Sequence, residues 1–514
     1  MKKYLPLIAL SLSLEASAQI PEDVLKYSFY APTGSARSQA IGGAMASLGG
    51  DISSIFINPA GLGNYRTSEV VFSPALVLHT NSANYRGTTT SGKRSGFDLG
   101  TSGVVMGYTD ARNHKRSSAF GIGITQLANY NNTITYKGLN NYSSFSEQWA
   151  EELSNSGLTI DEALNNASFA YGTAPALYTY LVDTFRVNGN LMVKSLPEFL
   201  LDNGSALMQE KTTRTSGGLY ELALAFAENH NDKWQWGATV GIPIMSYSNT
   251  TTFTERDTSS ATNNNFGYFT YTDQYSTHGA GLNLKGGVIY RPQEYLRFGL
   301  AIHTPSYLFS VKDKRTTDLS TDTENYNSTA SVSSKTFTNG VPGESKYAVL
   351  TPWKVMLSGS YVFREVADVR KQKAFITADV EYVGQNSSGF HSANEDPTAD
   401  ETAYYKALNR VIRGEYKGNF NFRLGGELKF NVIMFRMGGA YTSNPYKDPA
   451  LKANRWQLSG GLGYRDKGFF VDLTYVHSWL KDVDFGYRLQ DRDNTFASIK
   501  TQRGHVALTV GIKF

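Results

Sequence analysis

The fold is decided by the C-terminal stretch, which runs from His505 to Phe514 and reads HVALTVGIKF. Every second residue of this stretch is apolar: Val506, Leu508, Val510, Ile512 and Phe514. The residues between them are small, polar or charged: His505, Ala507, Thr509, Gly511 and Lys513. Successive side chains of a β-strand point to opposite faces, so this two-residue repeat predicts a strand with one wholly apolar face.

The same alternation recurs elsewhere with charged residues on the second face. In the stretch 420–430, FNFRLGGELKF, apolar residues occupy one face of the expected strand, and Arg423, Glu427 and Lys429 occupy the other. The stretches 373–384 and 296–304 follow the same rule. A soluble sandwich also alternates, but its strands seldom carry so many charges, whereas a membrane barrel turns apolar residues to lipid and polar residues to its lumen. The pattern therefore favours a transmembrane barrel.

Fourteen segments of this kind follow one another, an even number, as single-chain bacterial barrels require. Short connections alternate with long ones, as periplasmic turns alternate with outer loops. The sequence thus predicts an all-β protein, a 14-stranded antiparallel transmembrane β-barrel with both chain ends on the periplasmic side. The expected strands are 69–79, 99–109, 117–128, 217–228, 234–245, 279–291, 296–304, 350–363, 373–384, 416–430, 432–442, 455–465, 468–479 and 504–514; the expected outer loops are about 80–98, 129–216, 246–278, 305–349, 385–415, 443–454 and 480–503.

The composition excludes several classes of function. The 514 residues carry 49 Lys and Arg against 45 Asp and Glu, a net charge of +4, so no basic surface for nucleic acid is expected. There is no cysteine, which excludes disulfides and thiolate metal sites. The eight histidines show no close ligand spacing, so neither a metal nor a cofactor is expected.

The N-terminus has the pattern of a secretory signal peptide. Lys2 and Lys3 precede an apolar stretch, 5–14, and the small residues Ala16-Ser17-Ala18. We expect residues 1–18 to be cleaved near Ala18, and no later run approaches the ~18 apolar residues of a spanning helix. Export and a barrel together predict an integral protein of the bacterial outer membrane, in contact with its lipid bilayer.

Aromatic residues support the membrane prediction. Trp and Tyr prefer the two interfaces of a bilayer, and four tryptophans stand at the ends of expected strands: Trp234, Trp353, Trp456 and Trp479. Each could equally be an ordinary surface residue. Phe514 resembles the terminal signal read by the barrel assembly machinery of the outer membrane; the alternative is the last residue of a buried strand. A monomer assembled by that machinery is the expectation.

A segment of about fifty residues, 19–67, precedes the barrel of 68–514. It is rich in Gly, Ala and Ser and contains Gly34-Ser35-Ala36-Arg37 and, later, Asn58-Pro59-Ala60. Small residues permit close backbone packing and proline fixes φ, so this segment can form a compact plug, or hatch, inside the lumen. The alternative is a flexible periplasmic tail.

Here a resemblance becomes specific. The order of Arg37, a Gly/Ala-rich stretch, Asp51 and Asn58-Pro59-Ala60, followed by fourteen strands, resembles the long-chain fatty-acid transporter (FadL-type) family of outer-membrane proteins. The stretch 120–125, FGIGIT, followed by Asn129-Tyr130, resembles that family's third strand, where a kink opens the wall sideways. The matches in sequence are confined to 34–62, 119–131 and the last strand.

The resemblance implies a passive transporter of hydrophobic compounds, with long-chain fatty acids as first choice of cargo. Ligand would pass from a groove between outer loops to a lumen pocket and leave laterally through the third-strand opening. Each buried methylene contributes ~0.8 kcal/mol, so apolar lining alone can capture acyl chains. The implied hatch or gate residues are Arg37, Asn58, Pro59 and Ala60; the implied lateral-exit residues are Gly123, Asn129 and Tyr130.

The largest expected outer loop, 129–216, contains helix-like apolar stretches. Four residues of this loop are candidates for a ligand-capture groove because apolar loop surface often marks such a site: Phe169, Leu177, Leu181 and Phe185. The alternative is that they pack the loop against itself or cap the barrel.

A carboxylate ligand would require a cation in the lumen. Four basic residues fall on the inward parity: Arg297, Lys354, Arg423 and Arg436. Because an arginine fork suits a carboxylate, Arg423 and Arg436 are candidate ligand-binding residues. The alternative role is lumenal ion pairing with Glu427 and Asp379.

Two other classes of function remain to be compared. His303 and His477 lie in expected strands without any local catalytic signature, so we do not expect an enzyme. A FadL-like surface barrel could instead bind or shuttle secreted proteins through its long loops. An apolar lumen with a side opening would favour transport, and a filled lumen with apolar outer loops would favour a protein partner.

Overall fold

A computed structural model of the chain describes residues 23–31, 33–187, 189–363, 373–449 and 451–514. The predicted signal peptide 1–18, its cleavage site near Ala18 and the first hatch residues, 19–22, lie outside the described residues.

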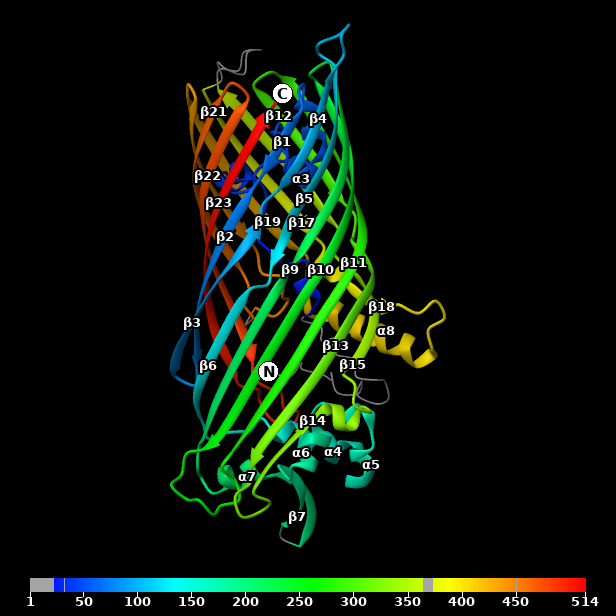
Figure 1. Ribbon diagram of the computed structural model, residues 1–514, viewed down its shortest axis with the longest axis vertical. Helices are drawn as coiled ribbons and strands as arrows, with labels where there is room; N and C mark the ends of the chain where they lie inside the picture. The colour runs from blue at the N-terminus through cyan, green and yellow to red at the C-terminus, as the bar shows by residue number, and fades with distance from the viewer. Residues whose placement is uncertain (1–22, 32, 188, 364–372, 450) are drawn as a thin grey trace.

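The described chain forms a closed antiparallel barrel of fourteen wall strands, which confirms the predicted fold (Figure 1). Several wall strands are interrupted and consist of two consecutive elements. In chain order the wall comprises β1 and β2 (Glu69–Phe72, Pro74–Tyr85), β3 and β4 (Thr88–Leu99, Ser102–Thr109), β5 and β6 (Ser117–Asn129, Asn132–Asn140), β9 (Leu207–His230), β10 (Trp234–Asp257), β11 (Tyr268–Gln293), β12 and β13 (Leu296–His303, Tyr307–Asp322), β15 and β16 (Gly343–Leu350, Lys354–Phe363), β17 and β18 (Ala374–Val383, Gly389–Ser392), β19 (Asn419–Phe430), β20 (Ile433–Thr442), β21 (Arg455–Asp466), β22 (Phe469–Phe485) and β23 (Phe496–Lys513).

The barrel closes where its last strand meets its first. β23 pairs with β22 on one side and with β1 and β2 on the other, with Val70 opposite Ile512 and Ala75 opposite Ala507. Leu508 and Ile512 are exposed on the outer face, whereas Ala507 is buried inside. The apolar parity of the C-terminal strand therefore faces outward, as the alternation predicts for a strand in lipid.

Aromatic side chains mark the two ends of the apolar outer band. Trp353, Trp456 and Trp479 are exposed toward the long loops, and Trp456 lies opposite Trp479 in the β21–β22 ladder. Trp234 is exposed at the short turn between β9 and β10, where its ring stacks on that of Tyr290 with 4.2 Å between centroids. This placement fits interfacial girdles.

The strands on one side run far past the apolar band. β9, β10, β11 and β13 extend through residues expected to be outer loops, including most of 246–278 and the first part of 305–349 (Figure 1). The expected loop 80–98 is likewise strand over almost its whole length, in β2 and β3. Stretches such as 248–254, SNTTTFT, are polar on both faces because they lie beyond lipid. A strand without an apolar face shows no alternation of apolar and polar residues, so the sequence does not reveal it.

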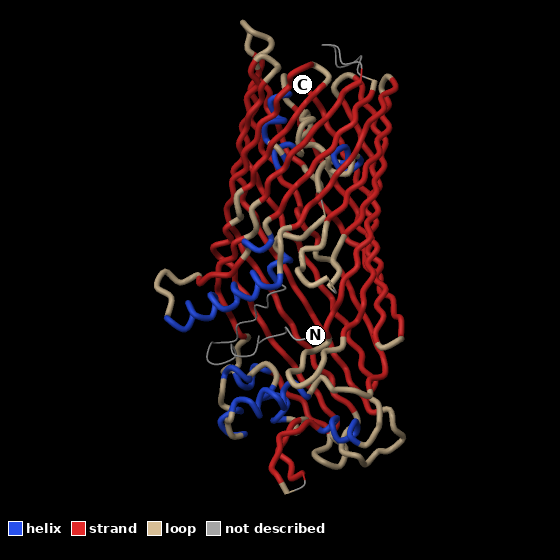
Figure 2. The backbone as a smooth tube through the Cα atoms, turned by 180° about the vertical axis from the view of Figure 1, so that it is seen from behind, coloured by secondary structure: helices blue, strands red, loops and turns tan. Residues whose placement is uncertain are grey.

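The hatch lies inside the barrel, toward the end with short turns (Figure 2). Its described residues form four short helices: α1 (Asp23–Lys26), α2 (Ala36–Ala40), α3 (Ser54–Ile57) and the 3-10 helix η2 (Pro59–Asn64). Almost every hatch residue from Ala36 to Gly63 is buried. The segment therefore fills the lumen as a plug.

Helical loops cover the opposite end (Figure 1). This cap contains α4 (Glu147–Ser156), α5 (Ile160–Leu164), α6 (Thr173–Tyr178), α7 (Leu196–Asp202), a two-stranded sheet of β7 (Val182–Val187) and β8 (Asn190–Ser195), and β14 (Thr329–Ser333); 3-10 turns stand at Ala167–Phe169, Ser334–Phe337 and Gln385–Ser387. A longer helix, α8 (Ala399–Glu415), projects sideways from the wall. None of the described helices combines the length and the hydropathy needed to cross a membrane.

Candidate ligand path and hatch contacts

Asn58 holds the hatch together and against the wall. Its side chain donates to the carbonyl of Ala46 at 2.6 Å and accepts from the amide of Ala60 at 3.2 Å, which caps η2. A Cβ at Gly287 of β11 would overlap the Asn58 side-chain oxygen, and a Cβ at Gly237 of β10 would meet the Pro59 carbonyl carbon at 2.5 Å. Asn58, Pro59 and Ala60 therefore sit against β10 and β11, in contact that only glycine permits.

We expect Asn58→Ala to loosen the hatch. The change leaves the buried carbonyl of Ala46 and the amide of Ala60 without their partner, at a cost of about 1–3 kcal/mol each. Hydrogen exchange of residues 44–64 should speed up at least about tenfold. Asn84→Ala, at an exposed strand position, is the control. Unchanged exchange in the Asn58 variant would show that the wall glycines alone fix the hatch.

Arg37 belongs to a charged network on the other side of the hatch. Its Nη1 donates to the carbonyl of Gly50 at 3.0 Å, and its Nε lies 3.8 Å from Glu427 of β19. Glu427 also pairs with Arg436 of β20 at 2.6 Å, and Arg436 pairs with Asp472 of β22 at 2.5 Å. Two predicted residues, Arg37 and Arg436, thus meet in one network that ties hatch to wall.

Two of the predicted lateral-exit residues, Asn129 and Tyr130, lie where the third wall strand is interrupted, whereas Gly123 lies within β5, opposite Gly103 of β4. β5 pairs with β4, but β6 forms a described ladder only with β9, and β3 only with β2. Between β3 and β6 the described chain therefore has no backbone ladder, although the two run side by side. The two wall strands are therefore not joined by backbone hydrogen bonds at this position.

Side chains bridge this gap in place of backbone bonds. Asn129 donates to the carbonyl of Phe97 at 2.7 Å, and Asn81 donates to that of Thr133 at 2.6 Å. Gln126 accepts from the amide of Leu99 at 3.1 Å. Such amide bridges satisfy the backbone groups without closing the sheet, so they can break without disturbing the neighbouring ladders.

Tyr130 and Gly123 link the gap to the hatch. The Tyr130 hydroxyl donates to the carbonyl of Lys26 in α1 at 2.8 Å. At Gly123 an added Cβ would lie 3.1 Å from Ile55 and 3.2 Å from Phe56, both in α3. A movement of the hatch would therefore shift residues that lie at or near the gap.

A small cavity of about 110 Å³ lies in the lumen beside the first hatch residues. Three basic and two acidic side chains line it: Lys285, Lys354, Arg423, Glu221 and Glu381. Lys285 pairs with Glu221, and Arg423 pairs with Glu381 at 2.8 Å. The Lys354 ammonium instead donates a hydrogen bond to the hydroxyl of Tyr30 at 3.5 Å and lies over the Tyr30 ring. Lys354 thus forms no direct ion pair among the described residues, although it is attracted to Glu381, the carboxylate that Arg423 binds.

The apolar residues predicted for ligand capture lie in the cap. Phe169, Leu177 and Leu181 are buried in one cluster with Phe145, Trp149 and Phe253, and Phe185 packs at its margin. This is the arrangement of the alternative interpretation, in which the loop packs against itself and caps the barrel. Ligand could reach these side chains only after the cap opens.

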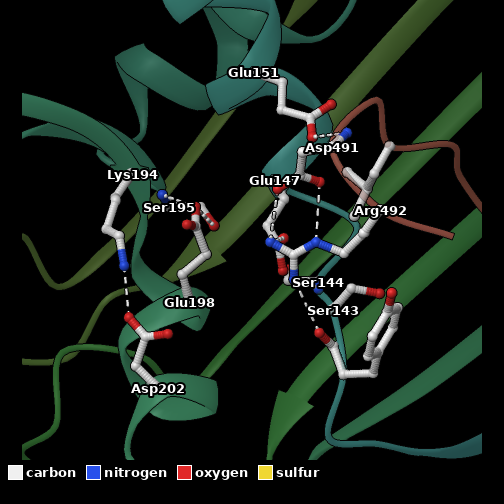
Figure 3. A network of polar contacts seen from close by, with 12 residues as sticks. Ser143, Ser144, Glu147, Glu151, Lys194, Ser195, Glu198, Asp202, Asp491 and Arg492 are labelled. Atoms are coloured by element: carbon white, nitrogen blue, oxygen red, sulfur yellow. Dashed lines mark hydrogen bonds and ion pairs between the residues drawn. The ribbon is translucent and has the colours of Figure 1, made fainter.

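Polar contacts also hold the cap (Figure 3). Glu147 of α4 accepts from the Ser144 amide at 2.6 Å and pairs with Arg492 at 3.1 Å. Desolvation by burial nevertheless raises the pKa of Glu147 from 4.5 to about 8, against the opposing effects of Ser144 and Arg492.

This shift predicts that the cap weakens as pH rises. A carboxyl group whose pKa is higher in the folded than in the unfolded state stabilises the fold fully at any pH below its unfolded pKa. For Glu147 that stabilisation is lost as the pH rises from 4.5 to 8. The loss amounts to at most about 5 kcal/mol. Hydrogen exchange of residues 141–206, corrected for its intrinsic pH dependence, should be faster at pH 9 than at pH 5. Glu147→Gln should reduce the difference but not remove it, because burial also raises the pKa of Glu255, which is bonded to Ser144 of the cap, to about 7. Glu210→Gln, at an exposed position, should retain the full difference.

The two histidines considered in the sequence, His303 and His477, each have a hydrogen-bond partner. His303 is buried, with Nε2 at 2.9 Å from the carbonyl of Ile57, and His477 is bonded to Tyr475. The described residues contain no group of three or more His, Cys, Asp or Glu that could hold a metal ion.

A FadL homologue of Pseudomonas aeruginosa superposes with a TM-score of 0.53 at 12% identity, covering 94% of this chain and 99% of the other. The fold is that of the FadL-type outer-membrane proteins. The toluene transporters TodX of P. putida (TM-score 0.52, 12% identity, 94% and 99% covered) and TbuX of Ralstonia pickettii (0.50, 15%, 95% and 100%) are similar to the same extent. No family model and no curated protein matches the sequence.

Proposed function

We propose that this protein is a passive outer-membrane transporter of hydrophobic compounds, not an enzyme, and that it belongs to the FadL-type family. The observation that carries the proposal is a wall without a backbone ladder between β3 and β6, directly beside a lumen filled by a hatch. An opening that leads into the bilayer spares an apolar ligand from returning to water. FadL-type neighbours with hydrophobic cargo support this function.

Transport would proceed by diffusion in three stages. Ligand enters under the cap, is held beside the first hatch residues and leaves through the gap at Asn129 and Tyr130. The lumen cavity of about 110 Å³ is smaller than the ~300 Å³ at which small-molecule pockets begin. The hatch must therefore shift before an acyl chain can be held, which is the gating step in this proposal. The protein would work as a monomer, assembled by the outer-membrane barrel assembly machinery.

We further propose a long-chain fatty acid as cargo, because Lys354 faces the cavity without a paired carboxylate. An ammonium bonded only to a neutral hydroxyl gains by meeting a carboxylate, and a hydrogen bond between charged groups contributes about 1.5–3 kcal/mol. The solved neighbours named as toluene transporters act on an uncharged compound. The charge of Lys354 is thus the feature that separates the two cargo classes.

Uptake of labelled compounds by cells that lack their own transporter tests both the proposed transport of hydrophobic compounds and the proposed fatty-acid cargo. Cells expressing this chain should take up labelled oleate, and Lys354→Met should lower that uptake about tenfold at unchanged surface abundance while leaving toluene uptake intact. Lys211→Met, which removes a buried lysine already paired with Asp484 at 2.7 Å, is the control. Toluene uptake without oleate uptake would replace the fatty acid by an aromatic hydrocarbon.

A binding partner or shuttle for secreted proteins is the second candidate, favoured by one observation. The β7–β8 tip of the cap exposes Leu191 and Met192, with Tyr178 and Tyr180 nearby. Correctly assembled protein that takes up neither oleate nor toluene would favour this function.

A further inference from the structure

Helix α8 carries a stripe of basic residues on its exposed face. Lys406, Arg410 and Arg413 recur at intervals of four and three residues, so these three side chains share one side of the helix, and Lys417 follows just beyond its end at Glu415. All four are exposed. The opposite face, with Tyr405, Leu408 and Ile412, is buried against Phe390 of β18.

These cations have no acidic partners in the described part of the chain. None of the four forms an ion pair there; Arg413 donates only to the carbonyl of Asn409, one turn earlier. Asp396, Asp400 and Glu401 stand at the far end of the helix, whereas Glu415 is the one acidic residue of α8 at its basic end. Basic residues therefore outnumber acidic ones in the part of α8 nearest the barrel.

The basic part of α8 lies beside the outer aromatic girdle. The helix ends at Glu415, and β19 begins four residues later with Asn419 and the exposed Phe420. The Phe420 ring lies 5.1 Å from that of Tyr382, which in turn lies 5.4 Å from Trp353. Both views show α8 leaving the wall sideways from this level (Figures 1 and 2). Interfacial aromatics mark the depth of lipid headgroups.

We propose that the basic stripe of α8 binds the phosphate-bearing headgroups of the lipid leaflet that surrounds the barrel. An amphipathic helix with Lys and Arg on its polar face is suited to an anionic membrane surface. Arginine forks match phosphate oxygens in pairs. The stripe faces away from the lumen cavity, so lipid rather than transported cargo is the partner, and the contact would orient the capped end at the membrane surface.

Lipid retention by the full-length protein tests this proposal. The protein is reconstituted in nanodiscs of phosphatidylcholine with a minor fraction of phosphatidylglycerol, extracted gently, and its retained lipids are counted by mass spectrometry. The wild type should enrich phosphatidylglycerol over the bulk ratio, and ~0.5 M salt should abolish the enrichment. Lys406→Gln, Arg410→Gln and Arg413→Gln together should reduce it about tenfold.

A matched variant controls for charge alone. Arg186→Gln, Lys335→Gln and Lys346→Gln remove three exposed cations from the loops and the strand beyond the apolar band and should leave the enrichment unchanged. Folding of each variant is checked by the heat-dependent gel shift of the barrel. Equal enrichment in wild type and the α8 variant, or equal loss in both variants, would overturn the proposal.

Discussion

A disulfide across the gap between β3 and β6 should stop transport, and its reduction should restore it. An added Cβ at Gly96 would lie 3.3 Å from the Cβ of Asn131, close to the ~3.5–4.5 Å that a disulfide spans. The chain contains no cysteine, so Gly96→Cys with Asn131→Cys forms one defined pair. If ligand leaves through this gap, the covalent bridge joins β3 to β6 and blocks the exit, and oleate uptake should fall to background.

The measurement is uptake before and after reduction in the same cells. Each single cysteine variant should transport like the unmodified protein under both conditions, because neither can close the gap. Full uptake with the disulfide in place, verified by the gel mobility of the oxidised protein, would exclude lateral release and direct attention to a route past the hatch toward the short turns.

Displacing the hatch should turn the barrel into an open pore. A Cβ at Gly438 of β20 would overlap the backbone of Ile41, so Gly438→Val cannot keep the hatch against the wall. The wall itself should persist, since valine favours strands and the ladders close without the hatch. A fourteen-stranded wall without its plug approaches the size at which porins leave an aqueous channel. We expect stepwise ionic conductance in planar bilayers from this variant and none from the unmodified protein.

Gly460→Val provides the matched control. Gly460 lies on the neighbouring strand β21, where an added Cβ would meet only the carbonyl of Arg436, at 3.8 Å. The same substitution there should leave the bilayer insulating. Deletion of 19–57, which removes α1 to α3 and Arg37, should give the largest conductance. A silent Gly438→Val protein with a correctly folded barrel would show that the hatch is held by Asn58 and Arg37 alone.

The candidate site was predictable only in part, and for different reasons at different residues. Asn58, Pro59 and Ala60 stood out as a motif, and the structure places them against the glycines of β10 and β11. Lys354 was noted only as one of four inward cations. Its special position depends on Glu221 and Glu381 pairing with other partners, a pattern of distances between strands far apart in the chain. Arg423 was singled out instead, and it lies in one of those ion pairs.

The sequence by itself determined the barrel. A strand that faces lipid on one side and a polar lumen on the other must alternate, and fourteen alternating segments with long and short connections leave one architecture. The length of the outer strands, the gap beside β6 and the buried cap were decided only by tertiary structure. Residues 248–254 carry no apolar parity, Asn129 reveals its role only once Phe97 lies opposite, and Phe169 or Leu181 could pack or bind equally well until a partner surface is present. Local patterns specify which face meets lipid; contacts between distant segments specify where the wall opens.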